Sequence, residues 1–368
     1  MHVLVTGGAG FVGGHLGKEL LKRGHKVRAL DNLTPQVHGE GKKRPIYLDE
    51  KIELQVGDVR NAADVKKALQ GVDAVIHLAA VVGVAQSMYE IEEYISVNNI
   101  GTAVLLEALI KHPVKKLVVA SSMSLYGEGL YESEAGEAVG DAERTLEQLK
   151  AHQWEPMRGG KPLKPVPTPE TKRPMLPSIY ALSKYDQERM CLMVGRAYGI
   201  PSVALRLFNI YGPNQALSNP YTGVLAIFAS RFLNGQPPLV YEDGAQRRDF
   251  VSVYDIARAF CLALEGDGAN GEVLNIGTGR SSSVLQVTQA LSKALGMKIE
   301  PEINGKYRVG DIRHCFADMT KAKKLLGYEA QVTFEDGIGD LVAWLKTASA
   351  EDKVVAANEE LTKRGLTV

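Results

Sequence analysis

A glycine-rich turn near residue 10 limits what this chain can fold into. Residues 2–6 form a short apolar stretch, and leucines at helical spacing follow the turn. A second apolar stretch over 26–31 ends at Asp31. The turn itself has the spacing G-x-x-G-x-x-G, set by Gly7, Gly10 and Gly13. This order predicts a β-α-β unit, in which glycine permits a tight turn and the N-terminus of a helix faces a phosphate group.

Asp31 indicates which ligand such a turn would hold. A carboxylate at the tip of the second strand is placed to bond a ribose 2′-hydroxyl, whereas it would repel a 2′-phosphate. Glycine-rich turns also occur in plain α/β proteins, but here strand, helix and acid are in register. We therefore expect NAD rather than NADP. Asp58, after a third expected strand at 52–56, would bond the adenine amine or else hold a turn.

The alternation of strand and helix continues to about residue 212. Further strands are expected at 74–80, 115–122 and 202–208, and helices at about 61–70, 90–111 and 179–198. This pattern predicts a Rossmann-type α/β fold, a doubly wound parallel sheet with both faces covered and ligands at the carboxyl ends of its strands. The small Ala79 and Ala80 would let a cofactor pass close, and His77 before them is expected to be a core histidine.

Tyr180 and Lys184 are the strongest candidates for chemistry. Four residues apart on an expected helix, they lie on the same face. A nearby ammonium lowers the pKa of a phenol, which gives a base able to take a proton from a sugar hydroxyl. Most such pairs are a surface tyrosine and a solvated lysine, but the glycine turn gives this pair more weight. Ser122, at a strand end, would bond the same substrate oxygen or else only its own backbone.

The chain divides into an NAD-binding part, 1–212, and a smaller α/β C-terminal part, 213–348, which mainly binds substrate. Some segments after residue 212 are expected to return to the first part. Residues 128–177 depart from the pattern and are either a lid or a solvated insertion, with a short helix near 141–152. The polar tail, 349–368, is expected to be a loose helix or disordered.

Three arginines of the C-terminal part are candidates for binding a diphosphate, because guanidinium binds phosphate groups bidentately. They are Arg248, Arg308 and Arg313. For any one of them, a surface salt bridge is the simpler interpretation.

Composition excludes several classes of function. Lys+Arg and Asp+Glu both number 43, so the formal net charge is zero and nothing global favours nucleic acid or a membrane surface. We find no signal peptide and no apolar run long enough to span a bilayer. Three separated cysteines, Cys191, Cys261 and Cys315, form no metal-binding pattern and fit a reducing compartment. We therefore expect a cytoplasmic protein without a metal site.

Taken together, the motifs resemble those of the extended short-chain dehydrogenase/reductase family, over residues 1 to about 345. The matching stretches are Thr6-Gly-Gly-Ala-Gly-Phe-Val-Gly13, Asp31-Asn32, Asp58-Val59, His77-Leu-Ala-Ala80, Ser121-Ser122, Tyr126-Gly127, Tyr180-x-x-x-Lys184, Arg206-x-Phe-Asn209, Tyr211-Gly-Pro213 and Arg248-Asp-Phe250. Members of this family are nucleotide-sugar epimerases, dehydratases and decarboxylases. The resemblance implies tightly held NAD, a catalytic triad of serine, tyrosine and lysine, and a homodimer packed through the helices near 90–111 and 179–198.

The family motifs also imply a role for individual residues. The implied catalytic residues are Ser122, Tyr180 and Lys184. The implied cofactor contacts are Gly7, Gly10, Phe11, Val12, Gly13, Asp31, Asn32, Asp58, Val59, Leu78, Ala79, Ala80, Asn98, Tyr180, Lys184 and Phe208. The implied substrate contacts are Ser122, Ser124, Asn209, Arg248, Arg308, Asp311 and Arg313.

Differences from the family pattern favour one reaction. The 4,6-dehydratases have a strand end resembling T-D-E-V-Y-G, and Met123 and Ser124 stand here at its acid and base positions, where neither can do that work. Decarboxylases keep a glutamate at the position of Ser124, and a 3,5-epimerase places a cysteine in this region. What remains matches a 4-epimerase, which inverts C4 of a nucleotide-diphosphate hexose through a 4-keto sugar.

Residues 165–180 and 214–223, with the long insertion, resemble the dTDP-L-rhamnose 4-epimerase group more than UDP-galactose 4-epimerases. That group often has a cysteine pair before the proline-rich stretch, and this chain has none there. Three alternatives stay open: a UDP-glucose/UDP-galactose-type 4-epimerase, a nucleotide-4-ketosugar reductase, and a non-catalytic dinucleotide-binding protein.

Overall fold

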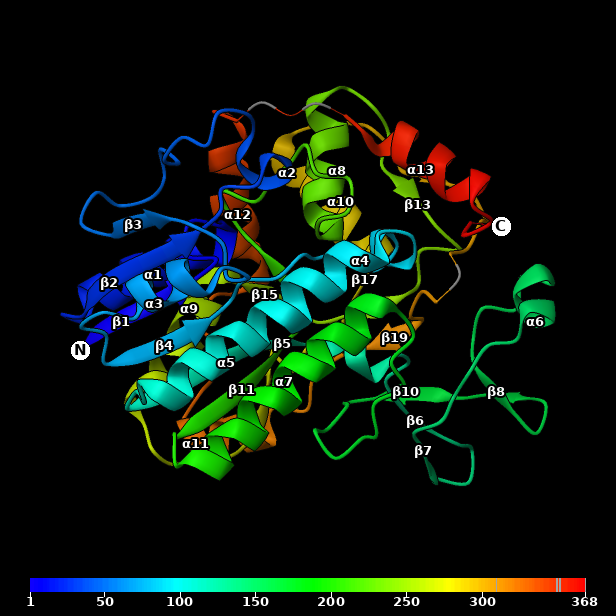
Figure 1. The fold of residues 1–368 in the computed structure, drawn as a ribbon. Helices are drawn as coiled ribbons and strands as arrows, with labels where there is room; N and C mark the ends of the chain where they lie inside the picture. Colours follow the sequence, from blue (N-terminus) through cyan, green and yellow to red (C-terminus); the bar gives the residue numbers. More distant parts are fainter. Residues whose placement is uncertain (309, 349, 351, 368) are drawn as a thin grey trace.

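A seven-stranded parallel sheet forms the centre of the molecule (Figure 1). The computed structural model describes residues 1–308, 310–348, 350 and 352–367. In spatial order the strands are β16 (Val273–Ile276), β11 (Ser202–Leu207), β5 (Lys116–Ser122), β4 (Ala74–His77), β1 (His2–Thr6), β2 (Lys26–Asp31) and β3 (Glu53–Val56). All neighbours pair in parallel, so the carboxyl ends of the strands meet at one edge. The strand order reverses between β1 and β4, which is where sheets of this kind bind ligands.

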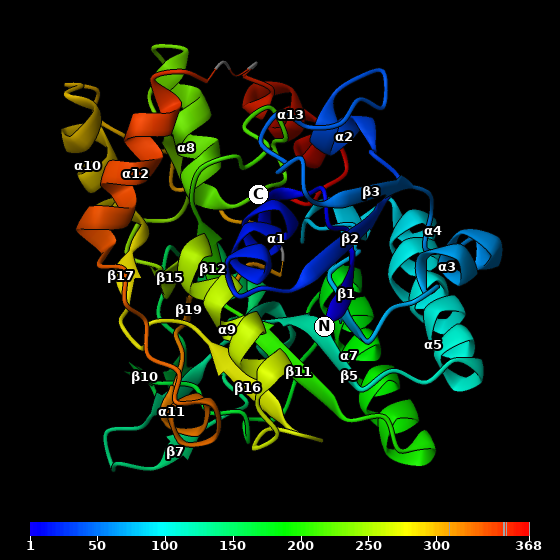
Figure 2. The same ribbon diagram turned by 90° about the vertical axis from the view of Figure 1, so that its left-hand side faces the viewer.

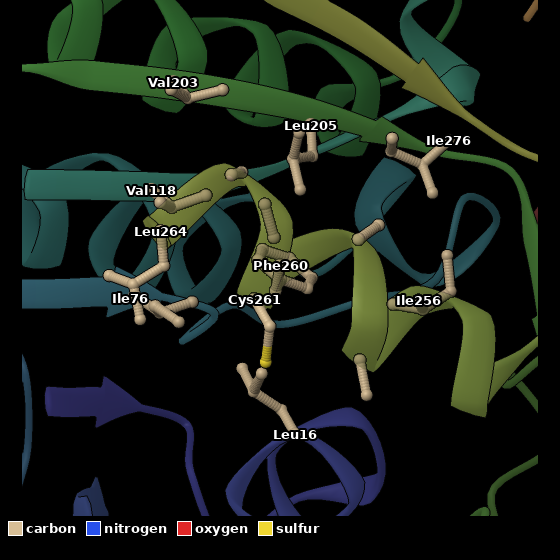
Figure 3. Close-up of a cluster of buried hydrophobic side chains, with 14 of the residues drawn as sticks. Leu16, Ile76, Val118, Val203, Leu205, Ile256, Phe260, Cys261, Leu264 and Ile276 are labelled. Carbon is tan, nitrogen blue, oxygen red and sulfur yellow. The ribbon is translucent and has the colours of Figure 1, made fainter. Parts of the chain in front are cut away.

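Helices cover both faces of the sheet and bury two apolar cores (Figure 2). One face carries α1 (Phe11–Lys22) and α9 (Val253–Glu265), and the other carries α3 (Ala62–Ala68), α5 (Gly101–Lys111) and α7 (Ile179–Tyr198). Figure 3 shows the first core, where Phe260 and Cys261 of α9 lie between Leu16 of α1 and strand residues such as Val118 and Leu205. The predicted Rossmann-type fold is confirmed.

The helix expected over 90–111 is interrupted. It consists of α4 (Ile91–Tyr94), a π-helical segment η2 (Ile95–Ile100) and α5. Asn98 lies in the wider π turn, and its side chain accepts a hydrogen bond from Val81 N at 2.8 Å and donates one to Val81 O at 3.1 Å. Such segments occur frequently at functional sites. Here the π turn fixes the chain that leaves β4 at the carboxyl edge of the sheet.

The 128–177 segment is more regular than the sequence predicted. A short helix, α6 (Leu146–Lys150), lies within the range expected for one. The rest forms a hairpin and a three-stranded sheet in the order β10-β6-β7. The strands are β6 (Leu130–Glu132), β7 (Ala138–Val139), β8 (Met157–Arg158), β9 (Lys161–Pro162) and β10 (Lys164–Val166). Strands of two or three residues carry no periodicity, so only the pairing partner reveals them.

A third core lies beside the sheet in the C-terminal part. Three helices form it: α8 (Val224–Leu233), α10 (Val284–Leu295) and α12 (Phe334–Leu345). Short strand pairs surround it: β12 (Asn209–Tyr211) with β15 (Phe250–Ser252), β13 (Leu239–Val240) with β18 (Glu302–Ile303), and β14 (Arg247–Arg248) between β17 (Ser282–Ser283) and β19 (His314–Cys315). The remaining short helices are α2 (Pro35–His38), η1 (Gln86–Met88), η3 (Met123–Tyr126) and α11 (Thr320–Leu326).

Segments after residue 212 do not all belong to the C-terminal part. The segments α9 and β16 follow residue 212 in the sequence, yet they lie in the layers of the central sheet. The tail forms a helix, α13 (Val354–Lys363), whose Val354, Ala357 and Leu361 are buried. Across the described residues, no helix combines the length and the apolar character needed to cross a membrane.

Candidate active site

A cavity of about 620 Å³ opens where the strands of the central sheet end. It runs from the glycine turn after β1, past the end of β5 and the start of α7, to the C-terminal part. Most of the residues singled out in the sequence line it: Gly7, Gly10, Phe11, Val12, Gly13, Asp31, Asn32, Val59, Leu78, Ala79, Ala80, Ser122, Ser124, Tyr180, Lys184, Phe208, Asn209, Arg248, Arg308 and Asp311. The cavity therefore joins the expected cofactor, catalytic and substrate residues.

The glycine turn forms a cradle that has no room for side chains. Gly7 has a φ of +67°, and a Cβ atom on Gly13 would lie 2.6 Å from the Gly7 carbonyl oxygen. The helix α1 begins directly after the turn. Its N-cap residue is Gly10, which has no side chain that could bond the first amides of the helix. Its first amides are therefore available to an anion, as the partial positive charge of a helix N-terminus favours. This geometry fits the pyrophosphate of a dinucleotide.

Asp31 shapes the cradle as well as lining it. Its Oδ2 accepts a hydrogen bond from Ala9 N at 3.0 Å, and its Oδ1 accepts one from Leu33 N at 2.9 Å. His38 of α2, which the sequence did not single out, brings its Nε2 to 3.5 Å from Asp31 Oδ1. A carboxylate has about four acceptor sites. Asp31 can therefore hold the turn and still accept from a ribose hydroxyl.

Two expected cofactor residues, Asp58 and Asn98, stay outside the cavity wall. Asp58 makes a 2.8 Å ion pair with Arg60 and accepts a hydrogen bond from Asn32 at 3.1 Å. The Arg60 hydrogen bond holds the pKa of Asp58 at about 2, so this carboxyl stays charged. Asn98 is fully buried and also donates to Ser183 Oγ at 2.9 Å. It positions the cavity wall at Val81 rather than lining the cavity itself.

Ser122, Tyr180 and Lys184 all line the cavity. Ser122 ends β5, and its hydroxyl lies 2.8 Å from that of Ser124. Tyr180 and Lys184 lie in the first two turns of α7, which Ser178 caps by accepting a hydrogen bond from Ala181 N. The ring of Tyr180 packs edge-on against that of Tyr94. Packing of its ring and the cap at its helix start thus hold Tyr180 in place.

The electrostatics of this group differ from the sequence-based expectation. Burial raises the pKa of Tyr180, and a hydrogen bond with Ser122 partly opposes the rise. Burial also lowers the pKa of Lys184 to about 8. The prediction that Lys184 lowers the pKa of Tyr180 is therefore not met in this state, because desolvation of the phenolate outweighs the effect of neighbouring groups.

Lys184 is held by a residue that the sequence reasoning missed. Its ammonium donates to Gln187 Oε1 at 2.6 Å, and Gln187 Nε2 donates in turn to Thr102 Oγ1 at 2.8 Å. Thr102 also bonds His77, which is buried and satisfied as expected for a core histidine. Gln187 stands three residues after Lys184, so helical spacing was the available signal.

The expected substrate residues Asn209, Arg248 and Arg308 line the cavity where it meets the C-terminal part. Some of their polar atoms are hydrogen-bonded and others are not. Arg248 donates to the Arg313 carbonyl oxygen at 2.9 Å, and it also contacts the carbonyl of Ile312. The guanidinium of Arg308 lies over the Tyr241 ring, 4.2 Å from its centre. Asn209 Oδ1 and Arg308 Nε are buried without a hydrogen-bond partner among the described residues. Such atoms indicate a ligand, because buried polar groups are nearly always bonded.

Arg313 does not reach the cavity, which corrects its assignment as a substrate contact. Its side chain is 1% exposed and lies within 3 Å of three carboxylates, those of Glu155, Glu242 and Asp243. Glu155 belongs to the 128–177 segment, so Arg313 joins that segment to the C-terminal part. The segment itself contributes no lining residue to the cavity within the described chain. Arg313 stands only five residues after Arg308 in the sequence. That closeness does not show that one side chain lines the cavity and the other is buried in ion pairs.

Comparisons with known proteins find a matching family model and similar relatives. The sequence model of the NAD dependent epimerase/dehydratase family matches residues 3–147 and 160–277. A dTDP-L-rhamnose 4-epimerase from Burkholderia thailandensis is 36% identical over 347 residues, which cover 93% of this chain and 94% of that relative.

Solved structures show a similar fold. A UDP-glucose 4-epimerase from Thermotoga maritima, solved with UDP-glucose, is 33% identical with a TM-score of 0.76, covering 94% of this chain and 99% of that chain. A UDP-glucose 4-epimerase from Thermus thermophilus, in complex with NAD, is 32% identical with a TM-score of 0.74, covering 95% and 100%. The two solved structures are named for a UDP-linked sugar, whereas the Burkholderia relative is named for a dTDP-linked sugar.

Proposed function

The chain belongs to the NAD dependent epimerase/dehydratase family and is an NAD-dependent enzyme of the isomerase class, and from this premise we propose that it inverts C4 of a dTDP-linked 6-deoxyhexose. The observation that carries the proposal is that Ser122, Tyr180 and Lys184 line the same cavity as the glycine cradle, Arg248 and Arg308. A nucleotide sugar held by its diphosphate at the arginines would bring its hexose to Tyr180.

The neighbours of Ser122 support epimerisation over water loss. Met123 and Ser124 are both buried beside it, and the Ser124 hydroxyl bonds Ser122. Neither a thioether nor a hydroxyl serves as a general acid and base near neutral pH, which elimination of water requires. Ser124 instead fixes the direction of the Ser122 hydroxyl at the cavity wall.

Each residue of the site has its own role in the proposed reaction. Tyr180, as phenolate, takes the proton of the sugar 4-hydroxyl and later returns it, while Ser122 bonds the same oxygen. When bound at the glycine cradle, NAD supplies a two-electron acceptor that holds the C4 hydride and gives it back. Lys184 lies on the same helix face as Tyr180, and as a cation it would favour the phenolate, although in this structure burial of the phenol outweighs any such effect.

Inversion requires the oxidised sugar to turn over while the rest of the substrate stays in place. Arg248, Arg308 and Asn209 line the cavity at its substrate end and would hold the diphosphate. Arg248 is itself fixed by backbone carbonyl groups, so the anchor does not move with the sugar. Positioning and charge then carry the catalysis.

The proposal also specifies the nucleotide and the hexose of the substrate. The dTDP-L-rhamnose 4-epimerase relative and the similarity of residues 165–180 and 214–223 to that group support a dTDP-6-deoxyhexose. The UDP-glucose 4-epimerases of similar identity favour the alternative, a UDP-hexose.

A panel of nucleotide sugars tests the function directly. We expect purified protein, incubated with dTDP-, UDP- and GDP-hexoses, to convert a dTDP-6-deoxyhexose to its C4 epimer, as followed by NMR. The reaction should proceed without net consumption of NADH, because each hydride removed is returned. Stoichiometric consumption of NADH would instead identify a 4-ketosugar reductase, and retained NAD without turnover of any sugar would contradict catalysis altogether.

We also propose that the chain forms a homodimer through α4, η2, α5 and α7. These elements expose large apolar side chains, among them Ile91, Ile100, Leu182 and Met193. We expect light scattering to give twice the mass of one chain, and Met193→Asp to shift it toward one chain. Ile303→Asp, which changes an exposed apolar residue on β18, is the control and should leave the mass unchanged.

A further inference from the structure

The last helix of the described chain, α13, forms one wall of the cavity. Val354, Ala357, Asn358 and Leu361 all line it. Their spacing of three, four and seven residues places them on one face of the helix. Figure 1 shows α13 beside α8 and β13, at the side of the molecule where the C-terminal part meets the chain around α4. The tail is therefore part of the site rather than a solvated appendage.

Contacts before, within and after α13 hold it in this position. Before the helix, Arg231 of α8 makes a 2.8 Å ion pair with Asp352. In its middle, Tyr241 donates from its hydroxyl to Asn358 Oδ1 at 2.9 Å. After the helix, the guanidinium of Arg364 lies 4.3 Å from the centre of the Tyr89 ring.

These contacts make α13 a bridge across the cavity. Arg231 belongs to the C-terminal part, whereas Tyr89 lies between η1 and α4 in the N-terminal part. Tyr89 in turn donates to the hydroxyl of Tyr221, which also lines the cavity. The helix thus closes a side of the cavity that neither part closes alone.

The order of groups along the cavity indicates what α13 faces. The hexose belongs at Tyr180 and the diphosphate at Arg248 and Arg308, so the nucleoside must extend beyond the arginines. Arg308 stacks on Tyr241, and Tyr241 bonds Asn358, which places α13 next along this path. Thr367, beyond the helix, also pairs with the backbone of Arg308.

We propose that α13 is the wall against which the nucleoside of the substrate binds. Val354, Ala357 and Leu361 would cover its apolar surface, and the side-chain amide of Asn358 would donate to a polar edge of the base. This inference rests on the proposed function for the positions of hexose and diphosphate. It assigns the C-terminal helix a role in substrate affinity and none in the chemistry at Tyr180.

Two neighbouring alanines of α13 provide a matched test. Ala357 is buried at the cavity and Ala356 is exposed, so Ala357→Phe fills the cavity and Ala356→Phe points to solvent. The probes are UDP and dTDP, which carry a nucleoside diphosphate without a sugar, measured by calorimetry. We expect Ala357→Phe to weaken both by at least about ten-fold, because the added ring would occupy the cavity space that the nucleoside needs. Ala356→Phe should bind both as the wild type does.

Further readouts separate a local effect from misfolding. Both variants should keep the NAD content and the melting temperature of the wild type. Asn358→Ala, which adds no bulk, should weaken UDP and dTDP by several-fold, while the binding of inorganic pyrophosphate stays unchanged. A general defect of the fold would lower pyrophosphate binding as well.

The proposal fails if Ala357→Phe binds UDP and dTDP as tightly as the wild type. Loss of sugar turnover alone, with normal binding of both probes, would place α13 at the hexose and would also overturn the proposal. The proposed function is tested separately. Wild-type protein that binds UDP or dTDP but epimerises no nucleotide sugar would contradict the proposed reaction, and it would leave the role of α13 in nucleoside binding intact.

Discussion

Replacement of Tyr180 by Phe is expected to lower kcat by about two to four orders of magnitude, the usual contribution of a positioned proton-transfer group. The variant loses only the hydroxyl, which in the proposed mechanism exchanges a proton with the sugar. The ring remains and keeps its edge-on contact with Tyr94. The fold, the glycine cradle and the arginines of the substrate end should therefore be unaffected, and the loss should appear in kcat rather than in binding.

The measurement compares kcat, NAD content and melting temperature for the purified variant. Tyr198→Phe is the matched control, because Tyr198 ends the same helix and is exposed. It should leave all three quantities at wild-type values. Tyr180→Phe with kcat within two-fold of the wild type would remove Tyr180 from the mechanism.

The pH dependence of the wild type gives a second check on Tyr180. Burial raises the pKa of its phenol, and the phenolate is the active form in the proposed mechanism. We therefore expect kcat to rise as the pH increases, until the phenol is deprotonated. This rise should be absent from the residual activity of Tyr180→Phe, because that variant has no phenol to titrate.

Replacement of Arg313 by Met should destabilise the protein by about 3–5 kcal/mol, the effect of removing one partner from a buried ion pair. Arg313 is 1% exposed and Glu242 is 3% exposed, so the Glu242 carboxylate would stay buried with Arg144 as its remaining partner, whereas Glu155 and Asp243 are 36% and 44% exposed. The loss should be visible in urea unfolding as a lower midpoint. Arg158→Met is the control, because Arg158 pairs with Asp141 at an exposed site and should contribute only about 0–1 kcal/mol.

The Arg313 variant also separates two assignments of this arginine. A structural role predicts lower stability with little change in the KM for a nucleotide sugar under conditions where the protein is folded. Binding of the diphosphate by Arg313 predicts the reverse, a raised KM at wild-type stability. That second result would restore the expectation formed from the sequence.

Much of the fold, and the common location of the candidate catalytic residues, could be predicted from the sequence, because local chemistry encodes them. Gly7 requires a positive φ, and Gly13 has no room for a Cβ atom, so the glycine spacing predicts the turn. Helical spacing places Tyr180 and Lys184 on one face. Ser122 ends a buried strand, and in a parallel sheet the strand ends share one edge. Each of these inferences needs only neighbouring residues or the period of an element.

Only the tertiary structure decided which charged groups face the cavity and which are buried in ion pairs. Arg308 and Arg313 stand five residues apart, yet one stacks on Tyr241 at the cavity and the other pairs with Glu155, 158 positions earlier in the chain. Tyr180 has a raised pKa because of the burial that surrounding elements impose. The tail helix α13 lines the cavity through contacts with Tyr241 and Tyr89. Pairing and burial of this kind depend on residues far apart in the chain, and no local pattern encodes them.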